Sequence, residues 1–353
     1  MDNPAAGNWI ILILPDETNG VMLTYKDNWK YYEFKFMKRG QIMFHSRHFS
    51  IHLLAEGIYA LIATEQGGAM SNAGIMDMGG YTLIFDTFNT PQAGKDLREA
   101  ALYLLDQPIG YVINSHWHGD HVRGNQFFSD ELIVSSSRTR ELMQETQPQW
   151  LARMTPLLPQ LEADIADAAV KLSAEPEQEK RLPLAAEHNY LLEIRESIET
   201  LAVTYPELTY DHQLTFHGSK RSVRLLSLGR AHTECDSILY SPADSLVFAG
   251  DVIAIRNHPL FTDGDPHSWL NALSALENLG AKQIVPGHGP VGDAGSIICM
   301  QEYIMDLLAV SQQYRGLEPK PDAAGIPVPE AYRDWSATGV YYRNLEFLLN
   351  RSF

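Results

Sequence analysis

The sequence predicts an α+β fold in which short strands and longer helices follow one another along the chain. Short apolar runs bounded by glycine recur, and such runs are typical of strands joined by turns. Between them, leucine and alanine recur at intervals of three and four residues, which indicates amphipathic helices. The chain has 353 residues, of which 45% are hydrophobic, so its length allows one large domain or two and its composition supports a large core.

Residues 1–47 differ in pattern from the rest of the chain and are assigned to an N-terminal extension. The apolar run Trp9–Leu14 and the aromatic and basic run Trp29–Phe36 predict a β-hairpin added to the edge of a sheet. The alternative is a natural chain that starts later. Lys38-Arg39-Gly40-Gln41 would be encoded by purine-rich codons shortly before Met43, as a bacterial ribosome-binding site would be.

The main domain is predicted to span residues 48–315 and to open with two hairpins. Glu56-Gly57 and Gly79-Gly80 supply their turns. Helical spacing of leucine and alanine comes next, and then a strand leads into a histidine-rich segment. The expected elements, in order, are hairpins of 51–54 with 58–63 and of 73–76 with 81–85, a helix at about 92–106, a strand at 110–113, a short helix at 122–128 and a strand at 132–134.

A long helical insertion is predicted between about residues 137 and 201. Leu158, Leu161 and Ile165 begin a run at helical spacing, and a second run lies later in the segment. Pro176 and Pro183 are expected to interrupt the helices, because proline removes a backbone donor and clashes with the preceding turn. We expect an αα-hairpin that covers the site or forms the face of a homodimer. The alternative is extra packing on the outer helix layer.

Strands and helices resume after the insertion, and residues 316–353 form a C-terminal tail. A proline-rich stretch at 319–329 links the main domain to a last helix. The expected elements are strands at 214–216, 223–228, 237–240 and 246–248, a helix through Trp269 and Leu279, a helix at about 295–314, and the last helix near 341–349.

The run His116-Trp117-His118-Gly119-Asp120-His121 is the most informative segment for chemistry. It comes directly after the apolar stretch Tyr111-Val112-Ile113, so it is expected at the end of a strand. His116 and His118 can point the same way from extended backbone, while Asp120 and His121 turn back from the next bend. This geometry suits two adjacent metal ions better than one.

One such motif does not fill two metal coordination shells, so other parts of the chain must supply ligands. His232 comes after Gly229-Arg230-Ala231, Asp251 comes after the apolar run at 246–248, and His288 lies between Gly287 and Gly289. Each is expected where a strand ends and a glycine-marked turn begins, which is where a scaffold usually presents catalytic groups.

Taken together, these motifs resemble those of the metallo-β-lactamase superfamily of hydrolases over about residues 49–310. The resemblance implies a four-layer αββα sandwich with metals at one edge. It also implies two Zn²⁺ ions per chain, with Fe or Mn as possible replacements. By that resemblance, one metal would be held by His116, His118 and His232, the other by Asp120, His121 and His288, and Asp251 would bridge them.

Other polar residues are candidates to support the site. The family commonly has an aspartate at the position of Asp86, which would accept a hydrogen bond from a ligand histidine. Thr233 and Asp236 lie next to His232 and are expected to support it, or else to bond locally within a turn. His258, in the loop after Asp251, is a candidate for substrate contact or leaving-group protonation, with a structural role as the alternative.

Asp251 narrows the function that the resemblance implies. Two-zinc β-lactamases usually carry Cys or Ser at this position, whereas a bridging Asp is similar to glyoxalase II, the acyl-homoserine lactonases and the phosphodiesterase branches. We therefore expect a dinuclear zinc-dependent hydrolase that uses a metal-bridging hydroxide to cleave a small ester, thioester, lactone or lactam. Asp120 would orient the hydroxide and Asp251 would set the metal–metal distance. The alternatives are a phosphodiesterase, an iron-dependent oxidoreductase of the same fold, or a non-catalytic scaffold.

The net charge and the cysteine content limit which classes of partner and which cellular compartment are expected. The formal net charge of −17 argues against nucleic acid and against an anionic membrane surface, so a small molecule is the expected substrate. Cys235 and Cys299 give no disulfide framework and no cysteine metal motif. The early apolar run Trp9–Leu14 is too short to span a bilayer and lacks the features of a signal peptide. A cytoplasmic location is expected.

Overall fold

The computed structural model describes residues 9–14, 21–26, 33–36, 44–314, 317 and 322–351. The chain divides into two units, Met1–Arg47 and His48–Phe353. In the first unit, three strands pair antiparallel in the order β1-β2-β3 and form a sheet of their own rather than the edge of another sheet. They are β1 (Trp9–Leu14), β2 (Val21–Lys26) and β3 (Glu33–Phe36). The segment from Lys38 to Met43, on which the prediction of a later start rests, lies outside the described residues.

The first sheet of the second unit has the strand order β10-β9-β8-β7-β6-β5-β4. Strands β4 to β7 pair antiparallel as two consecutive hairpins, as predicted, and β7 to β10 pair parallel. The parallel strands need crossover connections, which the helices supply. The strands are β4 (Phe49–Ala55), β5 (Ile58–Ala63), β6 (Ala73–Asp77), β7 (Thr82–Phe85), β8 (Ile109–Ile113), β9 (Leu132–Ser136) and β10 (Leu208–Tyr210).

The second sheet has the order β11-β12-β13-β14-β15, with β14 and β15 parallel and the other pairs antiparallel. Strand β14 is longer than the predicted run at 246–248 and is buried along its whole length. The strands are β11 (Gln213–His217), β12 (Ser222–Gly229), β13 (Asp236–Ser241), β14 (Leu246–Ala254) and β15 (Gln283–His288).

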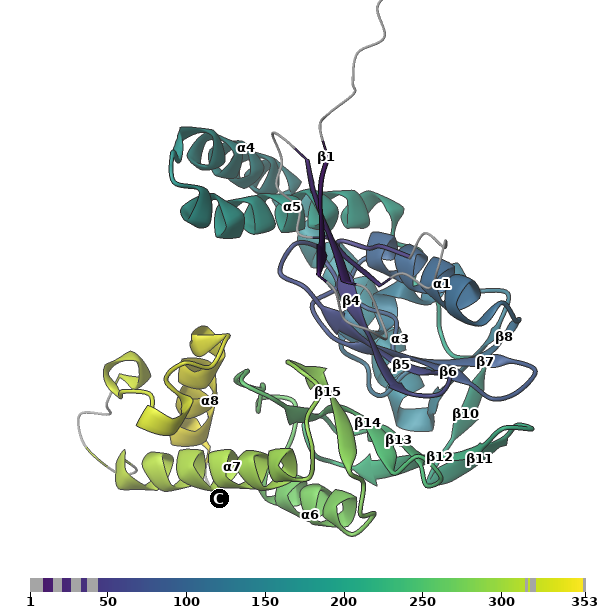
Figure 1. Ribbon diagram of the computed structural model, residues 1–353. Helices are drawn as coiled ribbons and strands as arrows, with labels where there is room; N and C mark the ends of the chain where they lie inside the picture. The colour runs from purple at the N-terminus through teal and green to yellow at the C-terminus, as the bar shows by residue number, and fades with distance from the viewer. Residues whose placement is uncertain are drawn as a thin grey trace, which may run out of the picture. The chain divides into compact units, whose positions relative to one another are not determined.

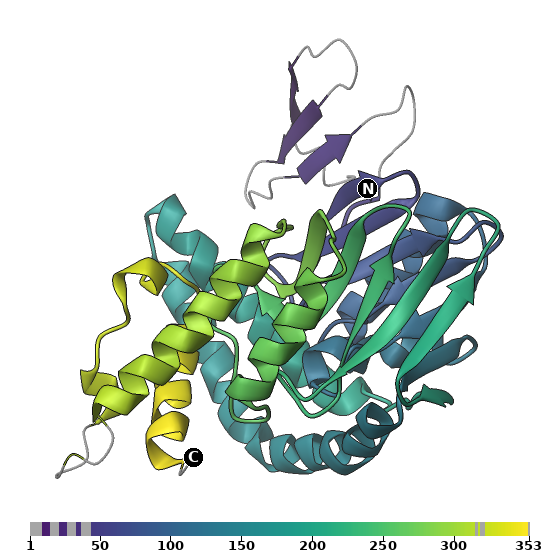
Figure 2. The ribbon, with the colours of Figure 1, turned by 90° about the horizontal axis from the view of Figure 1, so that it is seen from below.

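The two sheets of the second unit pack face to face with helices on the outer sides, so the predicted αββα sandwich is confirmed (Figures 1 and 2). The buried cluster between the sheets includes Phe85 from one sheet and Phe248 from the other, whose ring centroids are 5.7 Å apart. A second buried cluster joins the outer face of the second sheet to helices α6 (Pro266–Glu277), α7 (Gly295–Tyr314) and α8 (Thr338–Asn350).

The predicted helical insertion between β9 and β10 is present. It consists of α3 (Ser137–Met154), the 3₁₀ turn η2 (Thr155–Leu157), α4 (Leu158–Ala174) and α5 (Gln178–Thr200). Pro176 lies in the break between α4 and α5, as expected. The prediction of a break at Pro183 was wrong, because this proline lies inside α5, where its fixed φ is helical and the cost is one lost backbone hydrogen bond. A homodimer through this insertion stays a prediction.

The remaining helices lie close to their predicted positions, with one exception. Residues 122–128 were expected to form one short helix, but α2 (Gly119–Val122) is followed by the 3₁₀ helix η1 (Arg123–Phe128). No helix in the described residues is long and apolar enough to span a bilayer. The other elements are α1 (Pro91–Leu105) and the 3₁₀ turns η3 (Ala323–Gly325) and η4 (Glu330–Tyr332).

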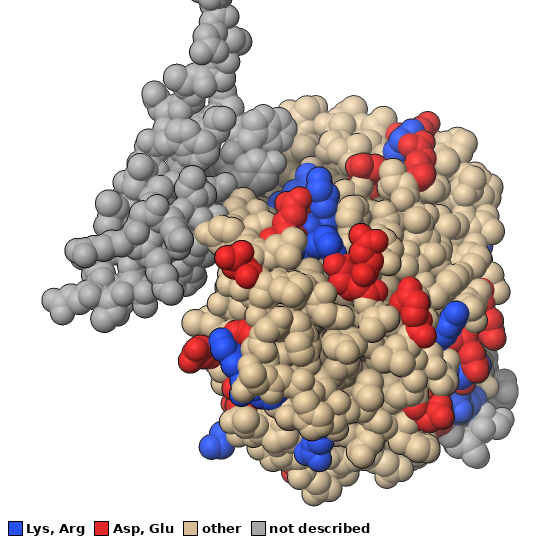
Figure 3. Space-filling view, turned by 90° about the vertical axis from the view of Figure 1, so that its right-hand side faces the viewer, with Lys and Arg blue, Asp and Glu red and all other residues tan. Residues whose placement is uncertain are grey.

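On the face shown in Figure 3, the Lys and Arg side chains of the described residues are scattered among Asp and Glu side chains. They form no continuous basic area on that face. This distribution accords with the net charge of −17, although the expected absence of a nucleic-acid partner stays a prediction.

Candidate metal centre

The histidine-rich segment begins after β8, at the end of a parallel strand. His118 has extended backbone angles, φ −61° and ψ 144°, and immediately precedes α2. Asp120 and His121 lie within α2, so the change from extended to helical backbone turns them back toward the histidines before them. The rings of His116 and His118 are 4.7 Å apart, and those of His116 and His121 are 4.3 Å apart. A local change of backbone conformation thus gathers the side chains of this segment.

The other predicted ligands come from the second sheet. His232 lies after β12, and His288 is the last residue of β15, as the glycine-marked turns predicted. Asp251 was expected just beyond a strand but lies inside β14. The pairing of β14 with β15 is irregular on both sides of Gly250, whose φ is +50°, and this distortion lets the strand continue past the site.

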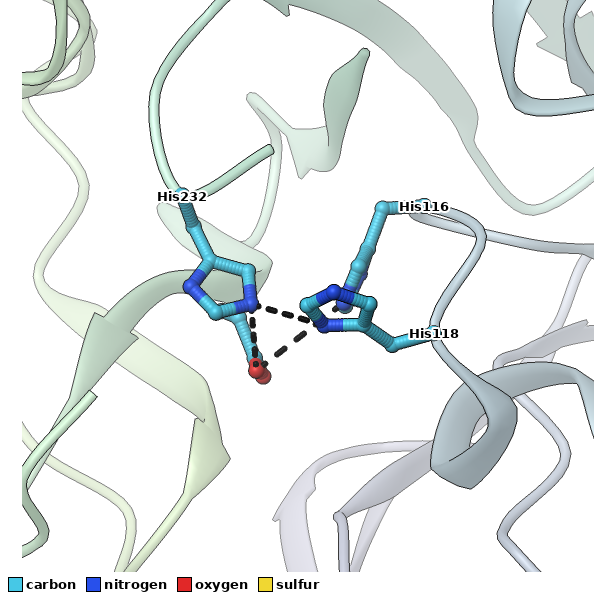
Figure 4. Close-up of side chains that lie close together, drawn as sticks. His116, His118 and His232 are labelled. Atoms are coloured by element: carbon cyan, nitrogen blue, oxygen red, sulfur yellow. Dashed lines mark hydrogen bonds and ion pairs between the residues drawn. The ribbon is translucent and has the colours of Figure 1, made fainter. Parts of the chain in front are cut away.

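His116, His118, His232 and Asp251 form the first of two groups in which all ligand atoms lie within 4.8 Å of one another. His232 Nε2 lies 2.9 Å from His118 Nδ1 and 3.2 Å from Asp251 Oδ2. His116 Nε2 lies 3.9 Å from the same carboxylate oxygen. Figure 4 shows the three histidine rings turned toward one another, with His116 and His118 on one segment of the chain and His232 on another.

Asp120, His121 and His288 form the second group. His288 Nε2 lies 3.3 Å from Asp120 Oδ2 and 3.3 Å from Asp251 Oδ2. His121 Nε2 lies 3.1 Å from Asp251 Oδ1. The Asp251 carboxylate therefore faces both groups, which is the position that a bridging ligand requires.

Each of the five histidines also has its other ring nitrogen near an oxygen atom. This arrangement fixes the orientation of the ring and leaves the inward nitrogen free to bind a metal. The pairs are His116 Nδ1 with Ser115 Oγ at 2.9 Å, His118 Nε2 with Asp263 Oδ2 at 3.0 Å, His121 Nδ1 with Asp86 Oδ2 at 2.7 Å, His232 Nδ1 with the Leu260 carbonyl at 2.9 Å, and His288 Nδ1 with the Met70 carbonyl at 3.1 Å.

Unpartnered polar atoms at the centre test whether a metal fits. Among the described residues, buried His116 Nε2 has no hydrogen-bond partner, and buried His121 Nε2 and Asp251 Oδ1 have only each other at 3.1 Å, without hydrogen-bond geometry. Leaving such groups unpaired costs free energy, and metal coordination would satisfy all three. Imidazole nitrogens with carboxylate oxygens form a donor set that suits Zn²⁺. The residues present therefore fit a pair of metal ions.

The centre is open to solvent on one side. The side chains of Asp120 and His288 are 18% and 19% exposed, whereas that of Asp251 is 6% exposed. His116 and His121 are fully buried. A substrate would therefore approach from the side of Asp120 and His288.

The imidazoles at the centre differ in how readily they hold a proton. Burial disfavours a charge on His288, but the Asp251 and Asp120 carboxylates raise its pKa to about 10. Burial also acts against a charge on His121, but Asp251, Asp86 and Asp120 raise its pKa well above 6.5. Burial lowers the pKa of His232 to about 4. Because a metal binds neutral imidazole, its binding displaces protons from His121 and His288 and strengthens as the pH rises.

Asp86 supports His121, as expected. It lies directly after β7 with a left-handed φ of 60°, a conformation that aspartate tolerates better than most residues. Its carboxylate accepts hydrogen bonds from the Ser115 amide and hydroxyl at 2.8 Å each, and one oxygen lies 2.7 Å from His121 Nδ1. Asp86 thus joins two segments that carry ligands.

Asp86→Ala is expected to weaken zinc binding by about 10–100-fold, because residues that orient metal ligands typically contribute this much to affinity. Asp86→Asn should lose less zinc affinity, because its amide oxygen can still accept a hydrogen bond from His121 Nδ1. Competition with a chelator of known zinc affinity measures the change. Asp130→Ala, at an exposed position, is the matched control. Equal zinc affinity in Asp86→Ala and the parent protein would contradict this role.

Thr233 and Asp236 bond to each other. The Thr233 amide and hydroxyl donate to the two Asp236 oxygens at 2.6 and 2.9 Å. No hydrogen bond from either residue to a ligand ring is found among the described residues. The alternative of local turn bonding therefore describes them better, and they act on His232 only by holding the backbone of its loop.

The structure places His258 in an aromatic cluster rather than at an open surface. Its side chain is 1% exposed, and Nδ1 lies 2.9 Å from the Tyr303 hydroxyl. The rings of Trp335 and Tyr341 each lie 5.6 Å from the imidazole. Burial lowers the pKa of His258 to about 4, so the ring is neutral at physiological pH. The expected substrate contact finds no support in this geometry, and the structural alternative describes it better.

Sequence reasoning missed Asp263 and Ser115, which contact His118 and His116. Asp263 lies in the loop between β14 and α6, far from His118 in the sequence. No spacing links the two residues. Ser115 directly precedes His116, and this adjacency was the one signal that pointed to it.

Comparison with known proteins gives a consistent result. A family model described as the metallo-beta-lactamase superfamily matches residues 67–288, more than half of the chain. The chain is 22% identical over 195 residues to the beta-lactamase-like protein 2 homolog of Caenorhabditis elegans, covering 55% of this chain and 47% of that protein. The match thus spans about half of that relative's length.

Similar solved structures include a metallo-beta-lactamase from Pontibacter korlensis, with a TM-score of 0.54 and 17% identity over 73% of this chain and 99% of that one. The DIM-1 metallo-beta-lactamase has a TM-score of 0.52 and 15% identity over 73% of this chain and 98% of its own. At this identity the likeness establishes the fold alone.

Proposed function

Because the chain belongs to the metallo-beta-lactamase superfamily, we propose that it is a dinuclear zinc hydrolase that cleaves a small ester, thioester, lactone or lactam. One observation carries the proposal: two ligand groups share the Asp251 carboxylate, with Asp251 oxygens 3.1 Å from His121 Nε2 and 3.2 Å from His232 Nε2. The same donor set also accepts Fe or Mn. Zinc is proposed because the site offers only imidazole and carboxylate donors, on rings whose orientation is fixed by hydrogen bonds to their other nitrogen.

Zinc ions held by these residues would lower the pKa of water to about 7 and polarise the bond that is cleaved. The protein's own groups position the reactants. Without metal, the charged His121 and His288 outweigh burial and hold the pKa of Asp120 far below its ordinary value, and bound zinc would supply that positive charge in their place. Because Asp120 lies on the open side of the centre, its carboxylate can accept a hydrogen bond from the attacking water and hold it toward the substrate.

The position of Asp251 also supports the choice of substrate class. A carboxylate stands here where two-zinc β-lactamases usually carry Cys or Ser, so we place ester, thioester and lactone substrates ahead of β-lactams. A phosphodiesterase is the second candidate, because a centre with two metal sites that share a carboxylate also suits an in-line displacement at phosphorus. A small-molecule substrate, a homodimer through α3–α5 and a cytoplasmic location stay predictions.

Metal analysis and a substrate panel test the proposed function together. Protein purified without chelator should contain two zinc ions per chain. It should hydrolyse at least one of a p-nitrophenyl ester, a lactone, a thioester or nitrocefin, and lose this activity on chelation. Turnover of bis-p-nitrophenyl phosphate alone would favour the phosphodiesterase. Iron as the bound metal, or no metal above trace, would refute the zinc hydrolase.

A further inference from the structure

Arg123 is fixed beside the metal-binding segment by close contacts of its guanidinium with Trp150 and Gly119. It is the first residue of η1, directly after α2. Its Cζ lies 3.7 Å from the centroid of the Trp150 ring, which belongs to α3 of the insertion. The guanidinium also lies close to Gly119: a Cβ added to this glycine would be only 2.2 Å from Arg123 Cζ and 2.3 Å from Arg123 Nη2. The guanidinium is therefore packed closely against Gly119 and stacked on Trp150.

The hydrogen bonds of Arg123 go to neutral groups. Nη1 donates to Asn89 Oδ1 at 2.6 Å, and Nε donates to Gln147 Oε1 at 3.3 Å. Gln147 in turn donates to the Trp117 carbonyl within the metal-binding segment at 2.9 Å. These bonds use one N–H of Nη1 and that of Nε, and the described residues offer no hydrogen bond to the second N–H of Nη1 or to either N–H of Nη2.

The charge of Arg123 lacks a carboxylate partner. No ion pair to Arg123 is found among the described residues, whereas Arg98 and Arg221 pair with Glu131 and Asp244 at 2.6 and 3.3 Å. Arg123 is half-buried, and the carboxylate that acts on its charge, Asp120, is itself a candidate metal ligand. Removing part of the water around a charge without an ion-pair partner costs free energy, so an anion that pairs with Arg123 would bind favourably there.

Arg123 lies near Asp120, a ligand on the open side of the centre: a Cβ on the preceding Gly119 would meet its guanidinium, and Asp120 acts on its charge. Arg123 also acts electrostatically on Tyr190 of α5, whose hydroxyl lies 3.4 Å from Met70 Sδ. The Met70 carbonyl holds His288, one of the more exposed ligands. The insertion thus brings Trp150 and Gln147 against Arg123, beside the more exposed ligand Asp120.

We propose that Arg123, held by Trp150 and Gln147 of the insertion, binds an anionic group of the substrate, a carboxylate or a phosphate, beside the metal centre. This proposal rests on the proposed hydrolytic function. A planar guanidinium with unpaired N–H groups along one edge recognises such an anion through two parallel hydrogen bonds. Helix α3 thereby selects substrates that carry a negative charge a few bonds from the bond that is cleaved.

Two esters that differ only in charge test the proposal. Mono-p-nitrophenyl glutarate carries a carboxylate where p-nitrophenyl valerate has a methyl group. The zinc-loaded protein should have the higher kcat/KM for the glutarate ester. Arg123→Gln should reduce that preference by about 10-fold or more, as expected for a lost hydrogen bond to a charged group. Arg123→Lys keeps the positive charge and should retain part of the preference for the glutarate ester.

The control is Arg138→Gln, which removes an exposed arginine of α3 that pairs with Glu141 and Glu234. It should leave the preference unchanged, and the zinc content of all variants should equal that of the parent. An Arg123→Gln variant that loses activity equally on both esters, or a parent protein without a preference, would overturn the proposal.

Titration calorimetry with glutarate itself gives a readout independent of turnover. Glutarate should bind the zinc-loaded parent more tightly than Arg123→Gln. If neither ester is hydrolysed, the proposed ester hydrolysis fails. The comparison of glutarate affinity between the parent and Arg123→Gln still decides the role of Arg123. Equal glutarate affinity in the two proteins would refute the anion site.

Discussion

Asp251→Ala is expected to abolish measurable hydrolysis and to lower the zinc content toward one ion per chain. The Asp251 carboxylate faces both ligand groups, with Oδ1 3.1 Å from His121 Nε2 of the second group and Oδ2 3.2 Å from His232 Nε2 of the first. Residues that only orient metal ligands contribute about 10–100-fold to affinity or activity, so loss of a shared ligand should exceed 100-fold. The variant also removes the carboxylate that offsets the charge on His121 and His288.

Asp251→Asn separates the loss of a ligand from the loss of packing. The amide keeps the volume of the side chain but presents an NH₂ group to one of the two sites, so zinc content should fall while the fold is retained. Zinc per chain, kcat/KM and the thermal midpoint measure these effects. Asp334→Asn, at an exposed position, is the control. Two zinc ions and full activity in Asp251→Ala would disprove the bridging role.

The local pattern of the sequence predicted most of the elements and the ligand residues that the structure brings together. Hairpins at β4–β5 and β6–β7 and helices α1 and α7 arise from periodicities that depend on neighbouring residues alone. His116, His118 and His121 are close in sequence, so their convergence needs only a strand and then a helical turn. His232 and His288 were singled out from glycine-marked turns at strand ends, but their assignment to one metal or the other required the resemblance, because each lies on a separate segment of the second sheet.

Contacts that depend on the path of a loop could not be predicted in the same way. Asp263 reaches His118 because the loop after β14 returns to the site, and no periodicity encodes that return. Thr233 and His258 lie near ligands in the sequence, yet Thr233 bonds to Asp236 and His258 packs against Tyr303. Closeness in sequence to a metal ligand is therefore weaker support for a role than a hydrogen bond to the ligand's ring.

Gly287→Ala is expected to damage the metal centre nearly as much as the loss of Asp251, although Gly287 carries no ligand atom. A Cβ at this position would lie 1.8 Å from Asp251 Oδ1 and 2.8 Å from the backbone carbon of Gly250. Neither contact is tolerable, so the carboxylate must rotate away or β14 and β15 must separate. Strand separation would add about 1–3 kcal/mol of overpacking cost, and either response moves Asp251 from its position between the two ligand groups.

Zinc content and the thermal midpoint of Gly287→Ala distinguish the two responses. Zinc that falls toward one ion with a nearly unchanged midpoint indicates that the Asp251 carboxylate has moved, whereas a fall in both indicates separated strands. Gly339→Ala is the matched control, because a Cβ there would meet no atom within 4 Å and alanine is favourable in the first turn of α8. If Gly287→Ala kept two zinc ions and parental kcat/KM, the close approach of β15 to Asp251 would not be needed for the centre. Gly287 would then be needed only for the conformation of the turn before His288.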